Sequence, residues 1–399
     1  MTPVPDSGPE ARLSSAGTAA AFLSSRRRAG LPGRVQAELR SSLRAHSALI
    51  ALVVLYVAAA HVVARLTGLR RDSYLEVLGD GFLLMAGLYV AGLLVAYALY
   101  TLVVIRPRRP LAHIQHGLTE FLSLERLCTA LPALLLLPAA VSSFGTIKGA
   151  IPLLHPYDWD PVLSRFTADL YGGRRLWEWL QPLLGHPWIT IALNAVYNSW
   201  FFVLWSVLFW QATSIARPVL RMRFFLSSVL AWALLGNLLA TVMASAGPAF
   251  YGRLTGLPDP YAPLMAYLHK VDAIAPVWAL QAQELLWRCQ AHGNPFIGCG
   301  ISAMPSMHAA TSFLFVLLGF GVSRGLGLLF SLFLALILVG SVHLGWHYSL
   351  DDYVALAGTW AIWGLVGRAL ACPLLRRWLW GPDAASAAPA GAAARCHVK

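Results

Sequence analysis

Charged residues are scarce in this chain of 399 residues. They make up 12% of the sequence, whereas hydrophobic residues make up 58%. Soluble domains contain about 25% charged and about 45–50% apolar residues. So few charged side chains cannot cover the surface of a globular protein of this size. The composition therefore excludes a soluble enzyme.

Cysteine is also scarce, with five residues and no Cys-x-x-Cys pair. Five scattered cysteines are too few for a disulfide scaffold and form no zinc-binding pattern. Cys289 and Cys299 belong to one long predicted loop. If that loop lies on an oxidising side of a membrane, the two can form a disulfide, and two free thiols are the alternative.

Acidic residues are outnumbered by basic ones. Asp and Glu total 18 against 30 Lys and Arg, which gives a net charge of +12. Such an excess is typical of proteins that bind nucleic acid. The alternative is a topology signal, in which Lys and Arg gather in the loops on one side of a bilayer.

Long apolar stretches are abundant. A membrane-spanning helix needs roughly 20 mostly apolar residues, and eight stretches fit that length, although the sixth is short. We therefore expect an all-α integral membrane protein, a polytopic bundle of about eight transmembrane helices. The expected spans are 48–66, 82–105, 127–147, 189–211, 224–245, 309–323, 326–346 and 353–372.

The basic residues favour an orientation with both termini inside. Eight spans in that orientation leave 20 Lys and Arg on the inner side and 10 on the outer side, whereas 12 of the acidic residues lie outside and 6 inside. This bias agrees with the positive-inside rule. The excess positive charge is thus spread over short inner loops and a tail, so nucleic acid is not an expected partner.

The chain divides into four segments. We expect disordered tails at both ends, an N-terminal transmembrane hairpin and a larger membrane domain that carries the chemistry. A Trp-rich piece in an outer loop, 176–184, is either an amphipathic helix in the membrane interface or part of a solvated loop. The four segments are 1–46, 47–126, 127–380 and 381–399.

Two histidines and an aspartate stand at the outer ends of helices. His308 opens the sixth span, and His347 and Asp351 lie between the seventh and eighth. Because spans six and seven form a hairpin, His308 and His347 return to the same side of the membrane. His347 and Asp351 are four residues apart and share one face if that corner is helical. A neighbouring Asp fixes the tautomer of a His, which makes His347 a candidate nucleophile and His308 a candidate proton donor.

Each of these residues also has a structural interpretation. A lone His at a membrane boundary is more often an interface residue than a catalytic one, but a converging cluster of ionisable groups near a membrane is costly and usually functional. His343, one helical turn before His347, is more often a packing residue. For the whole chain, the alternative to an enzyme is a transporter or a lipid-binding scaffold.

These residues resemble the motifs of a known family. Residues 305–308, Pro-Ser-Met-His, and 347–351, His-Tyr-Ser-Leu-Asp, are similar to the second and third motifs of the type 2 phosphatidic acid phosphatase superfamily. The Met before His308 and the His-Tyr-x-x-Asp form resemble its inositolphosphotransferase branch, which contains inositol phosphorylceramide synthases. Residues 148–152, 157–160 and 246–248 with Tyr251 are also similar to that branch.

The resemblance implies a mechanism. In that family the third-motif His attacks phosphorus to form a phosphohistidine and is held by the Asp, while the second-motif His protonates the leaving oxygen. These roles fall on His347, Asp351 and His308. Ser306 and the start of span six would contribute donors to the phosphate. No cofactor or metal is implied.

Two departures concern the phosphate-binding groups. The family's first motif, Lys-x6-Arg-Pro, is matched at Lys148 only with His155 in place of Arg, and the Arg expected six residues before the third-motif His is replaced by Ser341. The cation must then come from another outer residue, and the candidates are Lys148, Arg253, Lys270 and Arg288. His343 is a further candidate for substrate binding.

The sequence therefore predicts a membrane enzyme, a lipid-phosphate phosphatase or phosphotransferase. Its partners would be a lipid-linked phosphate substrate and membrane lipids. The charge bias places the active site on the non-cytoplasmic face, and we expect the plasma (inner) membrane as its location.

Overall fold

The computed structural model describes residues 30–69, 74–291 and 300–381, and within these ranges the only regular secondary structure is helical. Seven helical segments are long and apolar enough to cross a membrane, which confirms a polytopic helical membrane protein. They are α3 (Ser47–Thr67), α5 with η2 (Leu83–Ile105), α7 (Leu124–Leu154), α10 (Pro187–Thr213), α11 to α12 (Pro218–Val242), α17 (Arg324–His343) and α18 (Ser349–Ala371).

The expected sixth span, 309–323, corresponds to α16 (Met307–Val322), an apolar helix of 16 residues. At 1.5 Å per residue it is about 24 Å long, shorter than the roughly 30 Å hydrocarbon core. Shorter elements connect the long helices. They are α2 (Leu31–Ala45), α4 (Tyr74–Val77), η1 (Leu78–Phe82), α6 (Pro110–Phe121), α8 (Asp160–Leu170), α9 (Leu176–Leu184), η3 (Ala231–Leu239, within the fifth span), η4 (Pro248–Phe250), α13 (Tyr251–Thr255), α14 (Ala262–Asp272), α15 (Trp278–Ala291) and α19 (Pro373–Trp380).

The centre of the bundle is the antiparallel pair α16 and α17, which packs against α10, α11 and α18. Lipid is as apolar as a leucine side chain, so helices in a membrane associate through close packing, and small residues allow it. Gly319 of α16 faces Gly327 of α17: a Cβ built on Gly319 would lie 3.0 Å from the Gly327 Cα. These glycines let the two helices pack closely near the turn that joins them.

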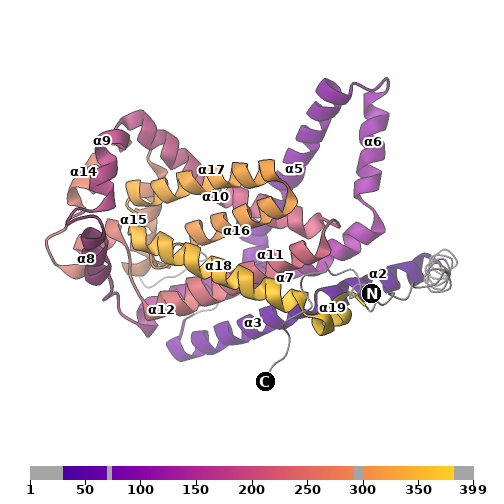
Figure 1. Ribbon diagram of the computed structural model, residues 1–399, viewed down its shortest axis with the longest axis horizontal. Coiled ribbons are helices and arrows are strands. Elements are labelled where there is room, and N and C mark those ends of the chain that lie inside the picture. Colours follow the sequence, from indigo (N-terminus) through magenta and orange to yellow (C-terminus); the bar gives the residue numbers. More distant parts are fainter. Residues whose placement is uncertain (1–29, 70–73, 292–299, 382–399) are drawn as a thin grey trace, which may run out of the picture.

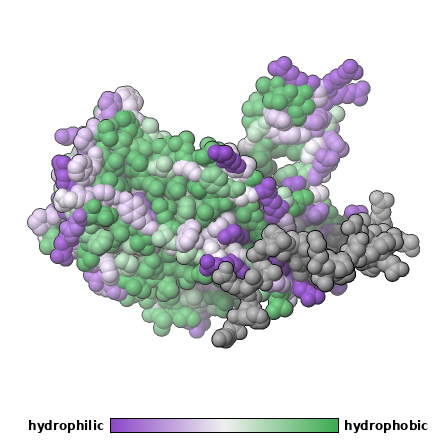
Figure 2. Space-filling model, viewed as in Figure 1, coloured by the Kyte–Doolittle hydropathy of each residue, from purple (hydrophilic) through white to green (hydrophobic). Residues whose placement is uncertain are grey.

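The N-terminal helices pack on the outside of this centre. Helix α3 lies along α7 and α11, and α5 contacts α10 but projects from the bundle, with only 6% of its apolar stretch buried. Figure 2 shows apolar side chains over the middle of the visible face and more polar ones towards its two ends. That distribution suits a bundle whose middle is surrounded by lipid.

The prediction of a disordered N-terminal tail is wrong for one part of it. Residues 31–45 form α2, which packs against α7 and α19, and Arg44 donates a hydrogen bond to the Arg377 carbonyl at 3.0 Å. Apart from Gly30 and His46, the rest of that tail lies outside the described residues, as does the C-terminal tail beyond Gly381. Composition alone missed α2 because its stability comes from contacts with helices distant in sequence.

The short helices of the predicted outer loops gather at one end of the bundle. Figure 1 shows α8, α9, α14 and α15 together at that end, and α2, α6 and α19 at the other. The Trp-rich piece 176–184 is a helix, α9, as one of its two interpretations expected. Cys289 of α15 is disulfide-bonded, and Cys299 lies outside the described residues.

Candidate active site

The two histidine motifs meet at the corner between α17 and α18. Helix α17 ends at His343, the chain turns at Gly345 with φ of +72°, and α18 begins at Ser349. A backbone hydrogen bond of 3.2 Å from Ser306 N to Asp351 O joins the start of α16 to the first turn of α18. Residues more than 40 apart in sequence are thereby held at one place.

The tautomer of His347 follows from its hydrogen bond. Its Nδ1 lies 2.9 Å from the carbonyl oxygen of Ala303. Because a carbonyl oxygen only accepts, Nδ1 carries the hydrogen, and Nε2 of the neutral ring keeps its lone pair. The side chain is buried, with 6% of its surface exposed. Nε2 is therefore the atom of this residue that can act as a nucleophile.

Asp351 contributes less directly than its spacing predicts. Its Oδ2 lies 3.4 Å from His347 Nδ1 but accepts a shorter hydrogen bond, 2.9 Å, from the backbone N–H of Tyr348. The Ala303 carbonyl is thus the principal partner of His347, and Asp351 fixes the corner in which His347 stands. Both carboxylates of the pair Asp351 and Asp352 are buried.

Asp352 was not expected at the site. Its Oδ2 accepts a 2.5 Å hydrogen bond from Ser341, the residue at the position where the resemblance expects an arginine. Burial lowers the pKa of His347; Asp352 and the Ala303 carbonyl oppose this, and the charge of Lys148 adds to it. Asp352 therefore opposes the effect of burial on the pKa of His347.

His308 is held between two aromatic rings of α10. It stacks on Tyr197 with 4.5 Å between ring centroids and 19° between planes, and Trp200 covers it at 4.0 Å. Trp200 is itself fixed by a 2.9 Å hydrogen bond from Nε1 to Thr311 Oγ1. The His308 and His347 rings are 6.4 Å apart, centroid to centroid. The two imidazoles therefore belong to one site.

One of three comparisons with known proteins gives a match. A family model described as the PAP2 superfamily matches residues 162–365, just over half of the chain, and includes both histidine motifs. The chain belongs to the PAP2 superfamily. No curated protein and no solved structure matches it. Proteins of the PAP2 superfamily are generally phosphatases and phosphotransferases, so the family establishes the class of chemistry but not this chain's activity.

Two of the further predicted residues of this PAP2 protein join the site. Ser306, fully buried, caps α16 by accepting a hydrogen bond from Ala309 N at 3.3 Å. Lys148 of α7 is partly buried, lies against Gly300 and acts electrostatically on His347. It stands outside the matched residues 162–365. This lysine, from a helix that begins before the family match, contributes to the lowered pKa of His347 through its charge.

Two other predicted residues have their contacts elsewhere. Arg253 pairs with Glu284 at 3.1 Å, and half of its side chain is exposed. His343 is buried, with Nε2 2.9 Å from Thr190 Oγ1, which agrees with a packing role. His155, the residue at the arginine position of the first motif, is bonded locally to the Pro156 carbonyl. Within the described ranges no group of three or more His, Cys, Asp or Glu side chains could hold a metal ion.

Asp160 supports the site through Tyr348. The sequence indicated it only as part of the segment 157–160, which resembles the inositolphosphotransferase branch. Its Oδ2 accepts from Ala246 N at 2.9 Å, and its Oδ1 from Gly247 N at 2.8 Å and from the Tyr348 hydroxyl at 2.7 Å. Burial raises the pKa of this carboxyl group, and the hydrogen bonds oppose the increase. Because Tyr348 follows His347, Asp160 anchors the corner that carries the nucleophile.

Gly247 allows the 246–248 loop to reach that corner. Its φ is +97°, and a Cβ on it would lie 2.5 Å from the carbonyl oxygen of Trp346. The next residues add a hydrogen bond of 2.9 Å from Ala249 N to Gly345 O. The loop and the corner therefore pack with backbone against backbone, which only a residue without a side chain permits.

Proposed function

We propose that this protein is an integral-membrane lipid-phosphate phosphatase or phosphotransferase that works through a phosphohistidine on His347. The observation that carries the proposal is the state of the His347 ring. Nδ1 is held by the Ala303 carbonyl, Nε2 keeps its lone pair, and a second imidazole lies 6.4 Å away. This is the arrangement of a positioned nucleophile with an acid beside it.

In the first half-reaction, His347 Nε2 attacks phosphorus and forms an N–P bond. The P–O bond to the leaving group breaks, and its electron pair stays on the oxygen, which takes a proton from His308. The stacking of His308 between Tyr197 and Trp200 supports this role because it restricts the ring to one orientation. Positioning of this kind accounts for much of the catalysis of phosphoryl transfer.

In the second half-reaction, an oxygen nucleophile attacks the phosphohistidine. His308, now neutral, takes the proton of that nucleophile, the N–P bond breaks, and His347 returns to its starting state. Water as the nucleophile gives a phosphatase, and a lipid or polyol hydroxyl gives a phosphotransferase. The resemblance to the inositolphosphotransferase branch favours transfer.

The negative charge of the phosphoryl group requires stabilisation. Lys148 is the cation whose charge acts on His347, and it would replace the absent third-motif arginine. The N-terminus of α16, capped by Ser306, contributes backbone N–H groups and the positive end of the helix dipole. Arg253, which pairs with Glu284, is not needed in this assignment.

We further propose that the site faces the non-cytoplasmic side of the plasma membrane. The support is the excess of Lys and Arg in the loops on the opposite side. The site lies towards the end of the bundle where α8, α9, α14 and α15 gather. There it would meet the headgroups of the outer leaflet.

Trapping the intermediate tests the proposal. Membranes are incubated with a phospholipid labelled with ³²P in the phosphoryl group to be transferred, then quenched in alkali, in which phosphohistidine survives. We expect label on the wild-type protein and on a His116→Ala control, whose histidine lies exposed on α6, but none on His347→Ala. Label on His347→Ala would overturn the proposal, and an unlabelled wild type would favour a transporter or scaffold. Free phosphate against a new phospholipid among the products separates hydrolysis from transfer.

A further inference from the structure

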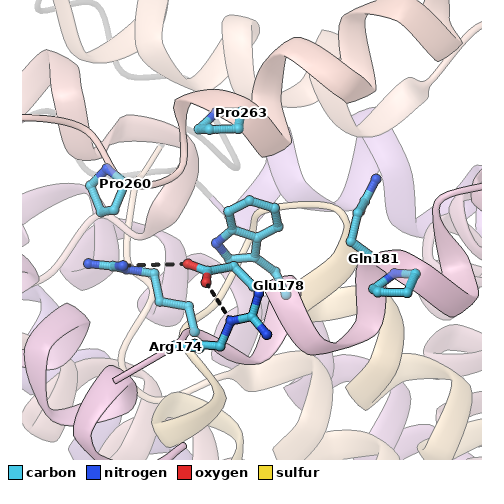
Figure 3. A pocket seen from close by; sticks show the side chains of 8 residues that line it. Arg174, Glu178, Gln181, Pro260 and Pro263 are labelled. Carbon is cyan, nitrogen blue, oxygen red and sulfur yellow. Dashed lines mark ion pairs between the residues drawn. The ribbon is translucent and has the colours of Figure 1, made fainter. Parts of the chain in front are cut away.

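A cavity of about 630 Å³ lies at the end of the molecule that carries the short helices, and the proposed mechanism does not use it. One wall is α9 with the two residues before it, and the other holds Pro260 and Pro263 at the start of α14 (Figure 3). The sequence of α9 predicts either an amphipathic helix in the interface or part of a solvated loop, and assigns it no ligand. Its polar and aromatic residues are those expected to contact a headgroup.

The cavity has more positive than negative charge. Glu178 lies 3.8 Å from Arg174 Nε and 3.6 Å from an Arg175 terminal nitrogen, and Figure 3 shows its carboxylate between the two. Two guanidinium groups thus share one carboxylate at distances longer than a good hydrogen bond. The trio keeps one net positive charge, and the guanidinium donors are available to an anion of matching geometry.

Three buried polar atoms of the cavity residues have no hydrogen-bond partner in the part of the chain that the structure describes. They are Arg175 Nε, Trp177 Nε1 and Gln181 Oε1. Buried polar groups are rarely left unpaired, because each unmade bond costs about 1–3 kcal/mol. Two are donors and one is an acceptor, and each gains a partner when the side chains around it move to admit a ligand with acceptor oxygens and a hydroxyl group.

The cavity is coupled to the site through aromatic side chains. Trp177 packs against the hydrophobic cluster that contains Tyr197 and against the one that contains Tyr348. The Arg175 guanidinium lies 5.5 Å from the ring centre of Tyr261, which contacts the Tyr348 ring at 5.7 Å. Tyr197 stacks on His308 and Tyr348 adjoins His347, so a ligand here would bind beside the groups that hold both histidines.

We propose that this cavity binds an anionic phosphoester headgroup bearing hydroxyl groups, presented by a membrane lipid. This inference rests on the proposed function, because it assigns the cavity the recognition of the lipid substrate. Arg175 and Arg174 pair with the phosphoester. Gln181 accepts from a headgroup hydroxyl, and Trp177 and the prolines cover its apolar face.

The test measures binding without turnover. The His347→Ala protein, full length in phosphatidylcholine nanodiscs, is titrated with fluorescent phosphatidylglycerol, which carries both a phosphodiester and hydroxyl groups. We expect Arg175→Gln and, separately, Gln181→Ala to weaken binding about tenfold, the effect of losing one charge-assisted or buried hydrogen bond. The matched control is Arg288→Gln, which removes an outer arginine paired with Glu284 by the same i, i+4 spacing but outside the cavity.

Several results would overturn the inference. One is equal affinity in Gln181→Ala and in the control, a comparison that holds even if Arg175→Gln fails to fold. Another is equal affinity for labelled phosphatidylcholine, which lacks net charge. Displacement of the lipid by inorganic phosphate at the lipid's own concentration would assign the site to free phosphate instead. Normal headgroup binding by a protein that forms no phosphohistidine would contradict the proposed function but leave this inference standing.

Discussion

The imidazole of His347 donates its Nδ1 hydrogen to the main-chain carbonyl of Ala303, 44 residues earlier in the chain, at 2.9 Å. The acceptor belongs to the segment that leads into α16 and His308. One hydrogen bond thus sets both the tautomer of the proposed nucleophile and its position relative to the proposed acid.

Replacing His347 by Ala is expected to lower kcat by at least about 10³-fold, because no neighbouring group can replace the nucleophile. The variant should still fold, since the main-chain bonds of the corner are unchanged. Phosphate release or lipid transfer in proteoliposomes measures the loss, with His116→Ala as the control for a histidine distant from the site. Activity within tenfold of the wild type would contradict the assignment.

The pH profile reports the protonation state of His347. Burial lowers the pKa of this group, so it stays neutral and nucleophilic below the pH at which an ordinary histidine becomes protonated. The acid limb of kcat/KM should therefore lie below about pH 6.5. Asp352 opposes the lowering, so Asp352→Asn should move the limb to still lower pH. A limb that moves to higher pH in this variant would show that another group titrates.

Asp160→Asn should lower both stability and activity. The amide offers one oxygen where the two carboxylate oxygens accept three hydrogen bonds, so its NH₂ group faces either the Ala246 N–H or the Gly247 N–H and the Tyr348 hydroxyl. We expect a loss of about 1–3 kcal/mol in the free energy of unfolding, with lower kcat as Tyr348 loses its anchor.

The matched control for this prediction is Asp158→Asn, two residues earlier. Asp158 is exposed and pairs only loosely with His155, at 3.6 Å. Thermal unfolding in detergent and turnover in proteoliposomes are measured for both variants. If the two behave alike, Asp160 does not position the corner.

Gly247→Ala separates steric overlap from backbone strain. The new methyl group would lie 2.5 Å from the Trp346 carbonyl oxygen, so the loop must move away from the corner. Gly256 also has a positive φ, +64°, but has open space around it. Gly256→Ala should cost about 1–2 kcal/mol of stability with little change in kcat, whereas Gly247→Ala should cost more stability and reduce kcat as well. Equal effects would exclude a role for the close approach.

Much of the membrane architecture can be predicted from the sequence, because hydropathy is a local property. The expected span 82–105 corresponds to Leu83–Ile105, and 189–211 lies within Pro187–Thr213. The last two spans are less accurate: α17 ends at His343 and α18 begins at Ser349, not at residues 346 and 353. A hydropathy reading assigns the polar pair Asp351 and Asp352 to a loop, whereas both are buried in the first turn of α18.

Part of the candidate site could also be predicted, because motif spacing is visible in the sequence. Motif spacing and the hairpin topology indicated His308, His347 and Asp351, and the structure brings them together. The Ala303 carbonyl could not be found in the same way, because every residue has a carbonyl group and no side-chain pattern marks the one that is used. Tyr197 and Trp200 read as ordinary aromatic residues of an apolar span until the fold stacks them on His308.

The sequence by itself determined that the protein is an integral membrane protein, that it is helical and that it carries two histidine motifs, since composition and short-range periodicity carry that information. Only the tertiary structure decided which groups hold His347, that Asp160 supports the corner, and that Lys148 lies near the histidines while Arg253 pairs elsewhere. These outcomes depend on contacts between segments far apart in the chain. Such contacts are selected by the packing of the whole bundle and have no local signature.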